Sequence, residues 1–114
     1  MYSTCARMTV EWYVPTGQMR PITLALHALA TESRSMPGCL GCSVSTDFAS
    51  QGIIRYVEEW VTEQHLRDRV RADTFTQLVN IIEETPEPPF VEFMLAHTTR
   101  GLDFVEEVRS VNDR

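Results

Sequence analysis

The chain contains no lysine, and all ten of its basic residues are arginines. Schiff-base catalysis, covalent attachment of pyridoxal phosphate and a phosphate-binding P-loop all require a lysine, so the sequence excludes these three kinds of site. Sixteen acidic residues outnumber the arginines, and the net charge of -6 disfavours binding to a phosphate backbone or to an anionic lipid surface. We therefore expect no nucleic acid and no membrane among the partners.

Long apolar runs and a cysteine framework are also missing. The longest apolar run, around residues 24–30, contains His27 and is far shorter than the roughly 20 residues of a membrane span. Residues 1–10 lack the apolar stretch of a secretory signal. Three cysteines, an odd number, do not suggest a disulfide framework. We expect a cytoplasmic protein with a single domain over residues 1–114.

Sequence motifs for common cofactors are absent too. There is no His-x-His or His-Glu-x-x-His pair, no glycine-rich nucleotide loop and no Gly-x-Ser-x-Gly. Cys39 and Cys42 form a C-x-x-C, but residues three apart on a strand point to opposite faces, so we interpret them as two small buried residues. The sequence predicts no metal, no flavin, no nicotinamide and no other cofactor.

The spacing of apolar residues predicts alternating strands and helices. Strands are expected at Met8–Val14, Cys39–Asp47, Gly52–Val61 and Phe90–Thr98. Helices are expected from about Met19 to Ser35, after an N-cap at Thr62, after a cap at Asp73, and over residues 101–110. The order β-α-β-β-α-β with a terminal helix is that of a ferredoxin-like α+β fold, with a core over residues 8–99 and an antiparallel sheet covered on one face.

The third predicted strand carries apolar area on both of its faces. Tyr56, Glu58 and Trp60 share one face with Ile54, while Ile53, Val57 and Val61 lie on the other. Helices of one copy cover only one face of such a sheet. We therefore expect a twofold homodimer that packs two sheets together.

Three sequence motifs resemble the antibiotic biosynthesis monooxygenase (ABM) family, including its quinol monooxygenase-like members. They are the Pro-Gly-Cys-Leu-Gly turn at residues 37–41, the Glu-x-Trp at Glu58 to Trp60, and Leu66 with the later Phe75. The resemblance covers about residues 8–99 and implies the dimeric α+β barrel. The known activities of the family include cofactor-independent oxygenation of anthrones and quinols and the degradation of haem, while other members have no known reaction.

The chain departs from the family pattern at one position of the second helix. The family's histidine falls on Arg69, three residues after Leu66. The first strand lacks the asparagine that haem-degrading members of the family carry there. No histidine follows Phe75 at a position where it could bind iron. These differences disfavour haem binding.

Tyr56, Trp60 and Phe75 are the candidate substrate-binding residues. An aromatic wall suits a flat quinol or polycyclic substrate, and ordinary core packing is the alternative.

His97, Arg69 and Glu58 are the candidate catalytic residues. His97 alternates with Val91, Phe93 and Leu95, so it can reach the same cavity as a base, with a hydrogen-bonded core histidine as the alternative. Arg69 would stabilise the substrate anion unless it belongs to a solvated helix face. Glu58 is either an acid or base, or the structural partner of an arginine such as Arg55 or Arg69.

Two functions from different classes follow from these residues. The first is a homodimeric, cofactor-independent monooxygenase that acts on a quinol-like or polyketide-like aromatic substrate. The second is a non-catalytic dimeric module of the same fold that binds a small molecule or a partner, and the arginine at the family's histidine position favours it.

Overall fold

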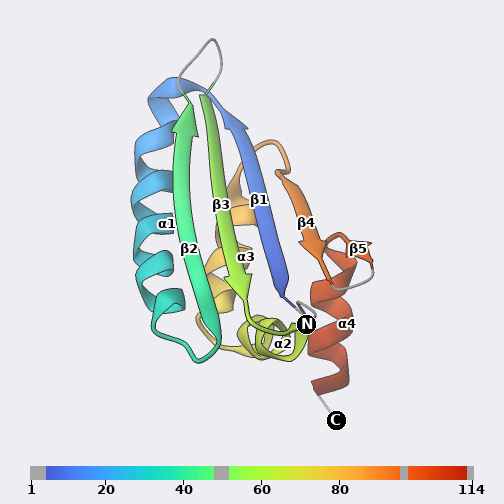
Figure 1. The fold of residues 1–114 in the computed structure, drawn as a ribbon. Helices are drawn as coiled ribbons and strands as arrows, with labels where there is room; N and C mark the ends of the chain where they lie inside the picture. Colours follow the sequence, from blue (N-terminus) through green and yellow to red (C-terminus); the bar gives the residue numbers. More distant parts are fainter. Residues whose placement is uncertain (1–4, 48–51, 96–97, 113–114) are drawn as a thin grey trace.

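The computed structural model describes residues 5–47, 52–95 and 98–112, and these form an α+β fold around one antiparallel sheet (Figure 1). The strand order is β2-β3-β1-β4-β5. The strands are β1 (Ala6–Val14), β2 (Cys39–Asp47), β3 (Gly52–Trp60), β4 (Phe90–Met94) and β5 (Thr99–Arg100). The helices are the short 3-10 turn η1 (Thr16–Gln18), α1 (Met19–Arg34), α2 (Glu63–Arg71), α3 (Phe75–Glu84) and α4 (Asp103–Asn112). The predicted ferredoxin-like fold is confirmed.

One face of the sheet is covered by helices. In Figure 1, α3 lies behind the strands, α1 runs alongside β2 at the left, and α2 lies at the end of the sheet where β3 ends. Helix α4 packs against α2. This arrangement leaves one layer of side chains enclosed between sheet and helices, and the fully buried members Trp12, Leu26 and Leu78 belong to it.

The burial of β1 and β3 follows the alternation of their sequences. Tyr56, Glu58 and Trp60 are all completely buried, together with Ile54, while Val57 on the other face is only half-buried. Removing apolar surface of this kind from water stabilises the fold by about 25 cal/mol per Å². The predicted shared face of Tyr56, Glu58 and Trp60 is therefore correct, and it is the face that the helices cover.

The last predicted strand ends earlier than its sequence pattern indicated. Strand β4 stops at Met94, and the Leu95 backbone N–H donates a 2.8 Å hydrogen bond to the carbonyl of Thr98. Thr99 and Arg100 pair antiparallel with Met94 and Phe93 as the short strand β5, which the sequence pattern did not reveal. The alternation of Val91 and Phe93 suggested a longer strand, because alternation identifies the faces of a strand but not the residue at which it ends. The prediction for His97 lies outside the described residues.

Of the two predicted helix caps, one is confirmed and one is wrong. The Thr62 hydroxyl accepts a 3.1 Å hydrogen bond from the backbone N–H of His65, as an N-cap does. Asp73 was predicted to cap the next helix, but α3 begins at Phe75 and its N-cap is Thr74. The Thr74 hydroxyl makes no capping bond, because it contacts Arg69.

A β-bulge at the start of β2 changes the orientation expected for the two cysteines of the C-x-x-C. Cys39 pairs with Trp60 and Cys42 with Glu58, and the register shifts between residues 39 and 41. Because Trp60 and Glu58 share the helix-covered face, both cysteines also lie against the core. The expectation of opposite faces was therefore wrong, and both side chains are free thiols.

Gly38 forms the turn that carries the chain from α1 to β2. Its φ of 84° is left-handed, and a Cβ at this position would collide with the ring of His65. Its carbonyl accepts a 2.8 Å hydrogen bond from the N–H of Val61. The turn therefore joins the start of β2 to the end of β3 and to the first turn of α2.

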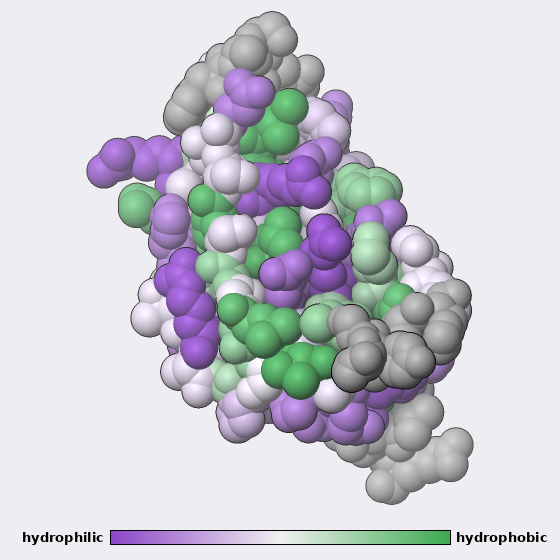
Figure 2. Space-filling view, viewed as in Figure 1, coloured by the Kyte–Doolittle hydropathy of each residue, from purple (hydrophilic) through white to green (hydrophobic). Residues whose placement is uncertain are grey.

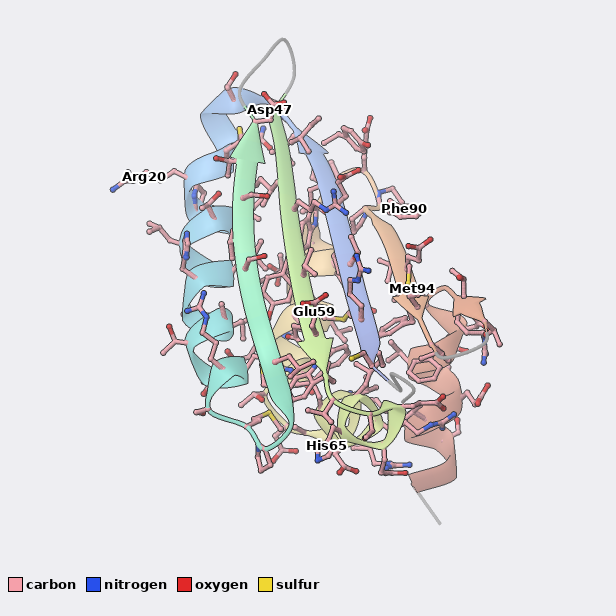
Figure 3. The ribbon with its side chains drawn as sticks, viewed as in Figure 1. Arg20, Asp47, Glu59, His65, Phe90 and Met94 are labelled. Carbon is pink, nitrogen blue, oxygen red and sulfur yellow. The ribbon has the colours of Figure 1, made fainter. Side chains whose placement is uncertain are left out.

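The face of the sheet away from the helices is open in this chain and mixed in character. Figure 2 shows apolar patches on this face, interrupted by polar and charged side chains. Glu59, Phe90 and Met94 lie on it (Figure 3), and Arg7 approaches Glu59 to 3.7 Å. Apolar area was predicted on this face, and the structure places it there among polar and charged side chains.

None of the helices in the described ranges is both long enough and apolar enough to cross a membrane.

Candidate functional site

Strand β3 and helix α2 bring four predicted residues into one cluster, which we call the Glu58 cluster: Tyr56, Glu58, Trp60 and Arg69. The three β3 residues point toward the helices because they alternate with outward residues along the strand. Arg69 comes from α2, which lies across the end of the sheet. All four side chains have an exposed fraction of 0%. The predicted alternative of a solvated helix face for Arg69 is therefore wrong.

The Glu58 carboxylate is the acceptor that holds the cluster together. Oε2 accepts hydrogen bonds from the Tyr56 hydroxyl at 2.5 Å and from Arg69 Nη2 at 3.1 Å. Oε1 accepts from the indole Nε1 of Trp60 at 3.2 Å, and Arg69 Nε lies 3.2 Å from both oxygens. A buried carboxylate is stable only with such partners, because removing a charge from water is costly.

Arg69 also contacts the turn between α2 and α3, with its third nitrogen and with its planar face. Nη1 donates to the Thr74 hydroxyl at 2.9 Å, and the guanidinium carbon lies 5.4 Å from the centroid of the Phe75 ring. Burial alone would lower the pKa of Arg69, but the charge and hydrogen bonds of Glu58 outweigh it and raise this pKa. Arg69 and Glu58 therefore form an ion pair in which the two opposite charges offset each other.

Two further side chains lie beside the Glu58 carboxylate: Tyr56 from β3 and Cys42 from the neighbouring strand β2. Burial, followed by the negative charge of Glu58, raises the pKa of the Tyr56 hydroxyl, so the hydroxyl stays protonated and donates to Glu58. Burial also raises the pKa of the Cys42 thiol to about 11, against the opposing effect of its hydrogen bond with Tyr56. A thiol of this kind is a weak nucleophile at neutral pH.

These contacts favour a structural role for Glu58 over a role in proton transfer. A general base needs a lone pair that can reach the substrate, and both Glu58 oxygens already accept hydrogen bonds from protein donors. The pair fixes Tyr56 and Trp60 in one orientation. Glu58 is therefore the partner of Arg69, one of the two arginines that the sequence suggested.

Phe75, the remaining candidate site residue in the described part of the chain, is buried and stacks on Arg69. His65, which was not a candidate, lies at the start of α2 (Figure 3), where its Nδ1 is 2.7 Å from the Thr62 hydroxyl. Sequence reasoning missed Thr74 and Arg109, which both contact this region. Thr74 is the residue after the predicted cap, Asp73, so the sequence came close to it. No local signal points to Arg109, because the Ala72 carbonyl that it contacts is 37 residues away in the sequence.

Two clefts among the described residues lie away from the Glu58 cluster. One of about 420 Å³ opens between α1 and α3 and is lined by Ile22, Ala25, Ile81 and Pro86, with Glu84 and Gln18. Another of about 430 Å³ lies beside α1 and includes Arg20 and His27. Residues 5–47, 52–95 and 98–112 contain no group of three His, Cys, Asp or Glu side chains that could hold a metal ion.

The buried pair should dominate the stability of this end of the fold. We expect Glu58→Gln and Arg69→Met each to lower the free energy of unfolding by about 3–5 kcal/mol, because each leaves an uncompensated buried charge or polar group. The double variant should lose about 1–3 kcal/mol less than the sum of the two. Urea denaturation monitored by circular dichroism measures all three.

Glu59 is the matched control for Glu58. It is the next residue of β3, and its partner Arg7 lies 3.7 Å away on the open face with both side chains partly exposed. Glu59→Gln should change stability by about 0–1 kcal/mol. A loss below 1 kcal/mol for Glu58→Gln would contradict the importance of the buried pair.

The raised pKa of Tyr56 predicts how stability changes at high pH. Above its ordinary pKa of 10.0, the unfolded chain loses the Tyr56 proton while the folded chain retains it. The free energy of unfolding should therefore fall as pH rises, by about 1.4 kcal/mol in total between pH 9 and 11 from this group. Tyr56→Phe should remove this part of the slope, as measured by urea denaturation between pH 9 and 11.

Tyr13 provides the control for this slope. It also donates to a glutamate two residues away, Glu11, at 2.8 Å, but it lies exposed on the open face. The hydrogen bond to Glu11 raises its pKa as well, so Tyr13→Phe should change the slope in the same direction but less. Equal effects of the two variants would argue against a special environment for Tyr56.

Solved structures similar to this chain share its fold at low sequence identity. A conserved protein from Methanosarcina mazei Go1 is 18% identical with a TM-score of 0.71, over 82% of this chain and 93% of that one. A protein from Nitrosomonas europaea, described as a candidate antibiotic biosynthesis monooxygenase, is 12% identical with a TM-score of 0.69, over 89% and 92%. A protein from Caulobacter crescentus CB15 with the same description is 15% identical, also with a TM-score of 0.69, over 85% and 93%.

Comparison of sequences gives a match to one family but to no individual curated protein. No functionally curated protein matches the sequence significantly. The sequence pattern of the antibiotic biosynthesis monooxygenase family matches residues 6–80, which include β1 to β3, α1, α2 and the Glu58 cluster. This chain therefore belongs to the antibiotic biosynthesis monooxygenase family.

Proposed function

We propose that this protein is a cofactor-independent monooxygenase that acts on a quinol-like or polyketide-like aromatic substrate. The observation that carries the proposal is that the family match over residues 6–80 includes Tyr56, Trp60 and Arg69, which converge on Glu58. A rigid group of aromatic rings suits recognition of a flat substrate.

Such a reaction needs no electrons from a cofactor, since the substrate can supply all of them. In the anthrone case, a base removes a proton from the activated CH₂ group, and the carbanion transfers one electron to O₂. The two radicals combine to a peroxide, which loses water. The CH₂ group and O₂ thus become a carbonyl group and H₂O. The protein must supply a base, an apolar environment and stabilisation of the anion.

His97 remains our proposed base, because an imidazole titrates near neutral pH. For Arg69 we propose an indirect role, since Glu58 already neutralises its charge. The Arg69–Glu58 pair would hold Tyr56 and Trp60 in position, and Phe75 would support Arg69 from the other side of the α2–α3 turn.

We propose that the substrate enters through the cleft between α1 and α3. This cleft of about 420 Å³ is within the size range of small-molecule sites, and Ile22 and Ile81 in its wall pack against the same core layer as Tyr56. Its wall is largely apolar, which suits an aromatic ring system, and Glu84 and Gln18 offer polar contacts.

The second candidate function is a non-catalytic dimeric module that binds a small molecule or a partner. The closed Glu58 cluster favours it, because all four side chains are buried and satisfy one another. A protein that kept the fold without the reaction would have the same cleft and the same stable cluster.

Oxygen uptake with a panel of quinols and anthrones, in the presence of a chelator, tests the first proposal. The wild type should consume oxygen above the uncatalysed rate. His97→Ala should reduce kcat by about 10²–10⁴-fold as loss of a general base. Trp60→Phe should reduce turnover as well, since it removes the indole donor to Glu58 and so loosens the cluster.

Leu102→Ala is the control, because this exposed residue lies just before α4, outside the cleft, the Glu58 cluster and the open face. It should retain wild-type turnover, and circular dichroism should show that all variants are folded. No turnover above the uncatalysed rate by the wild type, together with saturable binding of the same compounds, would replace the oxygenase with the binding module.

We also propose that two copies pack their open sheet faces together. The face carries Ile53, Val57, Phe90 and Met94 among charged residues, and Tyr13 and Phe90 are among its exposed large side chains. A self-complementary contact between two identical sheets would remove this apolar area from water.

The mass in solution tests the homodimer. The wild type should have twice the chain mass of 13.0 kDa. Val57→Arg, at the centre of the open face, should have the mass of one chain, because it would bury an unpaired charge. Leu24→Arg, on the exposed side of α1, should remain a dimer. A wild-type mass of one chain would exclude the proposed pairing.

A further inference from the structure

Helix α4 places one arginine on the end of α2. Arg109 donates from Nε to the carbonyl of Val70 at 2.8 Å, and from Nη2 to the carbonyl of Ala72 at 3.3 Å. The last carbonyls of a helix have no partners within that helix. Arg109 therefore caps the C-terminus of α2 from a different helix, at the end where a positive charge is favourable.

The same guanidinium also contacts the first residues of α3. Its central carbon lies 5.5 Å from the centroid of the Phe75 ring, and Nη2 lies 3.4 Å from the Thr76 hydroxyl. Arg69 stacks on that ring as well, at 5.4 Å. Phe75 is thus a common contact of one half-buried arginine, Arg109, and one fully buried arginine, Arg69.

The turn between α2 and α3 connects these contacts to the Glu58 cluster. Its Thr74 hydroxyl accepts from Arg69 Nη1, and the Phe75 N–H donates to the carbonyl of Ala72 at 3.0 Å. Ala72 is also the carbonyl that Arg109 binds. A shift of this turn would move the two supports of Arg69, namely the Thr74 hydroxyl and the Phe75 ring.

We infer that Arg109 is a positioning residue for the Glu58 cluster: it holds the 72–75 turn so that Arg69 keeps its geometry toward Glu58, and through Glu58 toward Trp60 and Tyr56. Helix α4 lies beyond the residues that match the family pattern. The relevance of this inference to turnover rests on the proposed function, but the positioning itself does not.

The two tryptophans make the inference measurable without any substrate. Trp60 Nε1 donates to Glu58 Oε1, whereas Trp12 Nε1 is buried without a hydrogen-bond partner among the described residues. Their indole N–H signals in a ¹⁵N-labelled NMR spectrum therefore report separately on the cluster and on the rest of the core. The test compares the indole N–H signals of Arg109→Ala and Arg109→Lys with those of the wild type.

In Arg109→Ala, the Trp60 indole signal should shift and its hydrogen exchange should become about tenfold faster, because Glu58 is less firmly held. The Trp12 signal should stay in place. Arg109→Lys keeps the charge but not the planar group, so its effect should be smaller. If Arg109→Ala does not fold, the lysine variant alone should still shift Trp60 selectively.

Arg100→Ala is the matched control. Arg100 binds Asp103 and Glu107 of α4 and contacts Phe104, without a contact to the 72–75 turn. It should leave the Trp60 signal unchanged. An unchanged Trp60 signal in Arg109→Ala, equal shifts of both tryptophans, or an equal effect of Arg100→Ala would each overturn the inference.

Turnover measurements distinguish a failure of this inference from a failure of the proposed function. If the wild type oxidises a quinol or anthrone, Arg109→Ala should lower kcat more than it raises KM, since the cluster rather than the cleft is disturbed. A selective Trp60 shift in a protein without turnover would keep the positioning role and reject the oxygenase.

Discussion

The ion pair between Glu58 and Arg69 is the constraint on which this end of the molecule depends. A carboxylate and a guanidinium are both fully buried, and neither is stable there alone. Three neighbouring polar groups bind the pair: Tyr56 and Trp60 donate to the carboxylate, and Thr74 accepts from the guanidinium. The pair thus determines how β3, α2 and the following turn meet.

The exclusive use of arginine has a structural counterpart in the packing of the helices. Four guanidinium groups stack on just two rings: Arg69 and Arg109 on Phe75, and Arg67 and Arg100 on Phe104. Lysine could supply the charge at these sites but not the planar surface or the forked donors. The helices α2 and α4 are therefore joined by stacked arginines as well as by apolar contacts.

The sequence predicted the fold better than the site, for physical reasons. Alternation on β3 and helical spacing are local properties, so the elements and the buried face of Tyr56, Glu58 and Trp60 could be predicted. The partner of Glu58 could only be narrowed to two arginines, because its choice depends on where α2 crosses the sheet. The bulge beside Cys39 and the long-range role of Arg109 have no local signature.

The joint burial of Glu58 and Arg69 also limits which substitutions this chain can accept at either position. A change at position 69 alone would leave the Glu58 charge without its partner in the core, and a change at position 58 alone would do the same to Arg69. The two positions are therefore coupled in mutation: a neutral pair can replace them together, but a single change at either position passes through a less stable protein.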